Sequence, residues 1–122
     1  RFLPGFAELE SDAIAKCSVL LGAPVKLLEA HILRQSQSFM AGTSFTPHTD
    51  TKDVKDAKLT ASIALIAPKP AALTADMRVI GCEPFGYLSK AGGMAIFKSC
   101  LHHESMPYLS EVVQLKVVLF IG

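Results

Sequence analysis

Two short stretches of this sequence bring together residues of types that bind metal ions. His48 and Asp50 stand two residues apart, and the adjacent pair His102 and His103 follows later, shortly before the last apolar run. Residues at positions i and i+2 of a strand point to the same face, so His48 and Asp50 would project side by side. Two histidines and one carboxylate on one face of a metal ion leave three coordination positions open. A His-x-Asp pair alone is equally typical of a polar strand end or turn, so the prediction of a metal site depends on both stretches.

A lysine within the last apolar run is the second unusual feature. Lys116 is the one cation in residues 112–121, where Gln114 is the only other polar residue. Burying an ammonium group without a counter-charge is costly. Lys116 therefore either lays its stem along apolar surface with its head in water, or meets an anion inside the fold.

The elements that would position these residues are one helix and a series of short strands. Residues 6–21 show apolar positions at helical spacing, and Gly22 and Pro24 supply a stop. This helix is expected to cover one face of a sheet. One helix followed by about seven or eight short strands favours a barrel or sandwich, and among these a jelly roll. The stretches predicted as strands are 25–37, the stretch with His48 and Asp50, 59–67, 77–80, 85–88, 94–100 and 112–121.

Composition indicates a single domain, residues 1–122, although the start at Arg1 rather than Met leaves a fragment of a longer chain as an alternative. The formal net charge of +1 argues against a nucleic-acid-binding surface. No apolar run approaches the roughly 20 residues that span a bilayer, so no membrane partner is predicted. Three cysteines without metal or C-x-x-C spacing predict buried free thiols in a reducing compartment, cytoplasmic or nuclear.

Several motifs, taken in order, resemble the Fe(II)- and 2-oxoglutarate-dependent dioxygenases, particularly the prolyl-4-hydroxylase-like group. The matching stretches are GTSFTPHTDT at residues 42–51, the strand at 59–67, GMAIF at 93–97, LHHESMP at 101–107, and Lys116 in the last strand. Their order and rough spacing agree from about residue 27 to the C-terminal end, so the resemblance covers most of the chain.

The resemblance implies a mainly β fold, a double-stranded β-helix (jelly roll) with an N-terminal covering helix. It implies Fe(II) held by His48, Asp50 and His103. His103 is preferred because the distal histidine of the family commonly precedes a proline by four positions, as His103 precedes Pro107. His102 would then point the opposite way along the strand, unless a bulge reverses the alternation.

The resemblance also implies the cosubstrates and the reaction. Lys116 matches the basic residue that pairs with the distal carboxylate of 2-oxoglutarate. The expected activity is that of a hydroxylase. It consumes O2, converts 2-oxoglutarate to succinate and carbon dioxide, and has ascorbate as a candidate further cofactor. The substrate is a small molecule or a protein side chain such as proline, the latter by analogy alone.

Two departures from the family pattern keep other functions open. Phe39 stands where family members often carry a tyrosine, and a Gly-Gly-x-Leu segment is replaced by residues 68–73. The alternatives are a non-catalytic jelly-roll binding module and a cupin-like metal enzyme that does not use 2-oxoglutarate. Bound iron together with 2-oxoglutarate-dependent release of succinate would separate the leading hypothesis from both.

Overall fold

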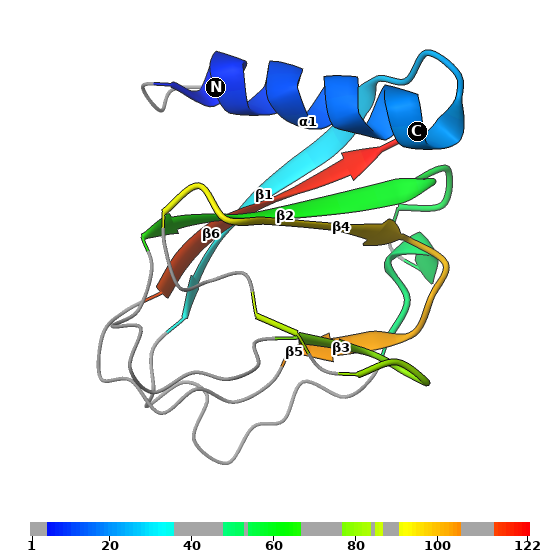
Figure 1. Cartoon of the computed structure of the whole chain (residues 1–122), viewed down its shortest axis with the longest axis vertical. Coiled ribbons are helices and arrows are strands. Elements are labelled where there is room, and N and C mark those ends of the chain that lie inside the picture. Colours follow the sequence, from blue (N-terminus) through cyan, green and yellow to red (C-terminus); the bar gives the residue numbers. More distant parts are fainter. Residues whose placement is uncertain are drawn as a thin grey trace.

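The computed structural model describes residues 5–35, 48–52, 54–66, 77–83, 85–86, 91–105 and 114–122. The elements in chain order are α1 (Phe6–Leu21), β1 (Leu27–Gln35), the 3-10 helix η1 (Asp50–Lys52), β2 (Leu59–Ile66), β3 (Met77–Val79), β4 (Met94–Lys98), β5 (His103–Ser105) and β6 (Gln114–Ile121). Figure 1 shows three layers: α1, a large sheet of β1, β6, β2 and β4, and a small sheet of β3 and β5. The described residues are thus mainly β with one α-helix, as predicted.

Helix α1 packs through one face against the large sheet. Its buried residues Phe6, Ala13 and Cys17 recur at helical spacing, so a single stripe of the helix turns inward. Gly22 ends the helix with a φ of 67°, a left-handed conformation that glycine adopts without strain. In the part of the chain that the structure describes, no helix has both the length and the apolar character needed to cross a membrane.

The large sheet is antiparallel, and its strand β2 is buried on both faces, whereas β1 is largely exposed. Alternate residues of β2 and β6 pack under α1 and form the main core. These residues are Leu59, Ala61, Ile63, Val117, Leu119 and Ile121. On the other face, Ala64 of β2 and Ala95 of β4 pack against Met77 of the small sheet. A second, smaller core therefore lies between the two sheets.

The face of the large sheet toward the small sheet carries three buried polar side chains, those of Thr60, Ser62 and Lys116. Thr60 and Ser62 share this face with Ala64, because the side chains of a strand alternate. Lys116 pairs directly with Ala64 across the β2–β6 ladder, and paired residues of an antiparallel ladder point to the same side. The buried polar side chains of β2 and β6 therefore face the space between the two sheets.

The small sheet brings His48 into the same space. Strands β3 and β5 pair with Val79 opposite His103. His48 forms an antiparallel bridge with His103 of β5. The backbone N–H of each residue donates to the carbonyl of the other at 3.0 Å. His48 and His103 are thus neighbours in the sheet although far apart in the sequence.

The predicted strand through His48 and Asp50 is wrong. His48 forms a single isolated bridge, and Asp50 begins η1. The Asp50 N–H donates to Ser99 O, and the Asp50 carbonyl accepts from Val54 N–H. Likewise, the strand predicted at 94–100 ends at Lys98, and the turn of residues 99–101 leads the chain into the other sheet. Of the strand predicted at 85–88, Phe85 forms a single bridge with Met77, and residues 87–88 lie outside the described part.

The prediction of buried thiols is correct for Cys17 and wrong for Cys82 and Cys100. All three thiols are free, but Cys82 and Cys100 lie in turns at the ends of β3 and β4, where their side chains are exposed. Cys17 lies on the side of α1 that packs against the large sheet. Its burial there raises the pKa of the thiol above its ordinary value, so this thiol stays neutral.

Candidate metal centre

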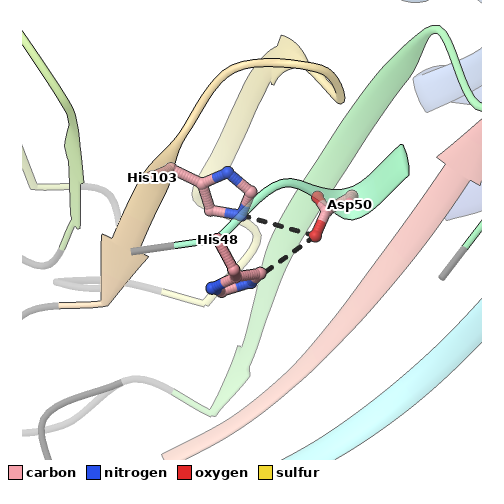
Figure 2. A group of neighbouring side chains, drawn as sticks. All are labelled: His48, Asp50 and His103. Atoms are coloured by element: carbon pink, nitrogen blue, oxygen red, sulfur yellow. Dashed lines mark ion pairs between the residues drawn. The ribbon is translucent and has the colours of Figure 1, made fainter. Parts of the chain in front are cut away.

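His48, Asp50 and His103 converge between the two sheets. One ligand atom from each side chain can be chosen such that all three lie within 4.8 Å of one another. Asp50 Oδ1 lies 3.6 Å from His48 Nε2 and 3.4 Å from His103 Nε2, as the dashed lines in Figure 2 mark. A single carboxylate oxygen thus faces both imidazoles.

The two histidines are presented by the backbone bridge between them. Their rings lie tilted with centroids 4.5 Å apart, and the Phe97 ring of β4 lies at the same centroid distance from the His103 ring. His103 is buried, whereas the side chain of His48 is 42% exposed. The centre therefore has a closed side at His103 and Phe97 and an accessible side at His48.

A backbone carbonyl sets the tautomer of His103. Its Nδ1 lies 2.9 Å from Leu101 O, an atom that can only accept, so Nδ1 carries the proton. Nε2, the other ring nitrogen, faces Asp50 Oδ1 at 3.4 Å. Histidines that bind a metal through one ring nitrogen almost always donate the N–H of the other ring nitrogen to a partner such as a backbone carbonyl.

Asp50 is held at its backbone and at one of its carboxylate oxygens. Its N–H donates to Ser99 O at 2.9 Å, and its Oδ2 accepts the Thr60 hydroxyl at 2.7 Å. Burial by itself raises the pKa of Asp50, but hydrogen bonds from His103 and Thr60 and the charges of His103 and His48 outweigh it. The pKa therefore lies below its ordinary value, and Asp50 is ionised at neutral pH.

These three residues fit a divalent metal ion. Asp50 Oδ1 faces the Nε2 atoms of both histidines, so a metal ion placed among these atoms would be bound by all three side chains. Ligand atoms about 2.0–2.2 Å from a metal ion and at right angles to each other lie roughly 3 Å apart. The 3.4 and 3.6 Å separations exceed that spacing by about half an ångström, and all three ligand atoms lie within 4.8 Å of one another. Two histidines and one carboxylate are the donor set of facial-triad sites for Fe(II).

The adjacent residue His102 is turned away from this cluster. Its side chain is exposed, and its carbonyl accepts the Ile80 N–H at 2.9 Å across the small sheet. His102 immediately precedes β5, and its exposure contrasts with the burial of His103. Pro107, which guided the choice between them, lies outside the described residues, as do Phe39 and residues 68–73.

Lys116 is buried on the same sheet face as the cluster, with 5% of its surface exposed. Thr60, which contacts Asp50, and Ala64, which pairs with Lys116, stand four residues apart on β2. At a rise of about 3.4 Å per residue, these two positions are about 14 Å apart along the strand. Lys116 thus belongs to the same inner surface, and its backbone lies opposite a β2 residue four positions from Thr60.

Sequence reasoning missed Thr60 and Ser99. Thr60 lies in an apolar strand and Ser99 follows another, and both are fully buried, with 1% and 0% exposure. The signal that could have found Thr60 is the alternation Thr60, Ser62, Ala64 within a strand whose other face is apolar. Nothing in the sequence indicated that Ser99 would reach Asp50.

Comparison with solved structures assigns the fold. The chain is similar to an oxidoreductase of the 2OG-Fe(II) oxygenase family from Burkholderia pseudomallei, with 18% identity, a TM-score of 0.64, and coverage of 89% of this chain and 50% of that one. It is also similar to SnoN, a non-haem alpha-ketoglutarate-dependent epimerase from nogalamycin biosynthesis, with 16% identity, a TM-score of 0.69, and coverage of 95% and 54%. A third neighbour is the non-haem monooxygenase ThoJ in complex with Ni, with 16% identity, a TM-score of 0.64, and coverage of 89% and 49%.

The described chain therefore has the fold of 2OG-Fe(II) oxygenases and carries a His-Asp-His cluster within it. It spans about half the length of these three neighbours. No protein-family model matches the sequence, and no curated protein matches it.

Proposed function

We propose that residues 1–122 form a single jelly-roll (double-stranded β-helix) domain of an Fe(II)- and 2-oxoglutarate-dependent oxygenase. The observation that carries the proposal is the convergence of His48, Asp50 and His103 within 4.8 Å. The fold of known 2OG-Fe(II) oxygenases supports it. Three free thiols favour a reducing compartment, so we place the protein in the cytoplasm or nucleus.

In this proposal the three side chains hold Fe(II) through Nε2 of each histidine and Oδ1 of Asp50. Iron bound in this way, together with 2-oxoglutarate and O2, supplies the oxidising power for C–H hydroxylation. The chain contributes the geometry: Leu101 O fixes the tautomer of His103, and Thr60 turns Oδ1 toward the histidines. His103 and Phe97 exclude water from one side, while the half-exposed His48 marks the side from which ligands enter.

Lys116 is the proposed anchor for the distal carboxylate of 2-oxoglutarate. The span of about 14 Å along the strand is to be bridged by one metal–ligand bond, a five-carbon dicarboxylate and the flexible four-carbon stem of the lysine. Ser62 lies between Thr60 and Ala64 on the same face and is buried, so the dicarboxylate would pass over this hydroxyl. A lysine rather than an arginine at this position is the reason for assigning this chain, within the proposal, to the prolyl-4-hydroxylase-like branch.

The proposed substrate is a protein side chain such as proline, with a small molecule as the alternative. SnoN and ThoJ are described as an epimerase and a monooxygenase, and both are neighbours in fold. Hydroxylation and epimerisation both begin with removal of hydrogen from a carbon atom. Assays of this chain should therefore include peptide and small-molecule substrates.

The adjacent histidines allow a sharp test of the metal centre. His103→Ala removes a proposed ligand, whereas His102→Ala removes an exposed imidazole one residue away. Loss of an outer partner of a metal ligand costs about 10–100-fold in metal affinity, so we expect loss of the ligand itself to cost at least about 100-fold. Binding of Fe(II) is measured anaerobically by calorimetry, and succinate release from 2-oxoglutarate is measured with ascorbate present.

The two readouts separate the alternatives. Wild type and His102→Ala should bind one Fe(II) and release succinate, while His103→Ala should do neither. Metal binding without 2-oxoglutarate-dependent succinate release in the wild type would instead support a cupin-like metal enzyme. No metal binding at all would support a non-catalytic binding module and refute the proposal.

A further inference from the structure

A directed chain of buried hydroxyl groups ends on Asp50. Thr60 Oγ1 lies 2.7 Å from Asp50 Oδ2, and Ser99 Oγ lies 2.8 Å from Thr60 Oγ1. A carboxylate only accepts hydrogen bonds, so the single hydroxyl proton of Thr60 points at Asp50. Ser99 must then be the donor in its bond to Thr60. Because both hydroxyl residues are fully buried, bulk water does not compete with either bond.

The two oxygens of the Asp50 carboxylate have different partners. Oδ2 is taken up by Thr60, and Oδ1 faces the Nε2 atoms of His48 and His103. Ser99 also holds the backbone of Asp50, because its carbonyl accepts the Asp50 N–H at 2.9 Å. The Asp50 residue is therefore held both at its backbone N–H and at one carboxylate oxygen.

The turn that contains Ser99 also orients His103. Residues 99–101 connect β4 to β5, and the carbonyl of Leu101 accepts the Nδ1 proton of His103. One short turn thus controls two of the three converging side chains, one through a hydroxyl and one through a carbonyl. Cys100 lies between these two residues with its side chain exposed, so it takes no part in either contact.

We propose that Thr60 and Ser99 are positioning residues that restrict Asp50 to metal coordination through Oδ1 alone. The inference rests on the proposed metal centre and deepens it by naming the groups that set how many coordination positions stay open. Without the Thr60 hydroxyl, Oδ2 is released and Asp50 can bind the ion through both oxygens. It would then occupy a position that a cosubstrate or O2 needs.

Four variants test this assignment, with Co(II) as the probe. Thr60→Val removes the hydroxyl while keeping the shape, Thr60→Ser restores the hydroxyl, and Ser99→Ala removes the donor to Thr60. Cys100→Ser is the matched control, since it alters an exposed side chain in the same turn. Affinity is measured by calorimetry, the coordination number by the Co(II) absorption spectrum, and folding by urea denaturation.

We expect Thr60→Val to change the Co(II) spectrum, because the released carboxylate can raise the coordination number. Co(II) binding should also weaken by about tenfold or more, because the carboxylate is no longer held in place before the ion binds. Thr60→Ser and Cys100→Ser should match the wild type in both readouts, and Ser99→Ala should fall between. A Thr60→Val protein that is less stable but binds Co(II) with wild-type affinity and spectrum has lost only packing, which overturns the inference.

The failures of the two proposals are distinguishable. If the wild type binds one Co(II) and Thr60→Val behaves identically, the metal centre stands and the positioning role is refuted. If the wild type binds no Co(II), the metal centre itself is refuted, and the positioning role with it. Should Thr60→Val fail to fold, Ser99→Ala decides: wild-type affinity and spectrum in that variant overturn the inference.

Discussion

Replacing Lys116 by methionine is the most direct test of the cosubstrate site. Lys116 is 5% exposed and lies on the sheet face that also carries Thr60 and Ala64. Methionine is close to lysine in length and flexible, so it can follow the same path between the sheets without the charge. We expect the free energy of unfolding to change by less than about 1.5 kcal/mol, as for other replacements of similar volume.

The effect on 2-oxoglutarate should be much larger than the effect on folding. A hydrogen bond to a charged group contributes about 1.5–3 kcal/mol. Since every 1.4 kcal/mol is about tenfold in affinity, Lys116→Met should weaken 2-oxoglutarate binding by about 10- to 100-fold. The burial of Lys116 places the contact where salt screens it little, so the loss should persist at raised ionic strength.

The assay is an anaerobic calorimetric titration of 2-oxoglutarate into the Fe(II)-loaded protein. Lys98→Met is the matched control, because Lys98 is an exposed lysine at the end of β4. Fe(II) affinity should be unchanged in both variants, since neither lysine belongs to the His48, Asp50 and His103 cluster.

Equal affinities of wild type and Lys116→Met for 2-oxoglutarate would refute the anchoring role. The proposal would then keep its metal centre but lose the charged group assigned to the cosubstrate. A loss of equal size in Lys98→Met would point instead to a general effect of charge on the binding of a dianion.

Two further predictions concern the thiols and the core. In native protein, iodoacetamide should modify Cys82 and Cys100 rapidly but Cys17 only after unfolding, because burial keeps the Cys17 thiol neutral and covered. Mass spectrometry counts the labels, and equal labelling of all three thiols would contradict the packing of α1. Ile63→Ala should destabilise the fold by about 2–5 kcal/mol, since Ile63 is fully buried between α1 and the sheet, whereas Val19→Ala on the exposed face of α1 should change stability by less than about 0.5 kcal/mol. Urea denaturation measures both, and similar small effects would show that α1 does not cover this core.

The sequence by itself determined those elements whose signal is local. The spacing of apolar residues along 6–21 predicted α1 with the bounds that the structure has, because one buried stripe on a helix repeats every three to four residues. Strands β1, β2, β3 and β6 fall within their predicted ranges for the same reason, since each carries a continuous or alternating apolar pattern. The types of the candidate ligands were also readable, because few side chains bind metals.

Only the tertiary structure decided how the candidate site is assembled. His48 and His103 meet through a bridge between distant segments, and Asp50 turns inward because a 3-10 helix, not a strand, follows His48. Thr60 and Ser99 reach Asp50 from two other segments of the chain. Cross-strand register and side-chain contacts of this kind depend on how whole sheets pack. No window of neighbouring residues encodes them, which is why the sequence indicated the ligand types but not the hydroxyl groups that orient them.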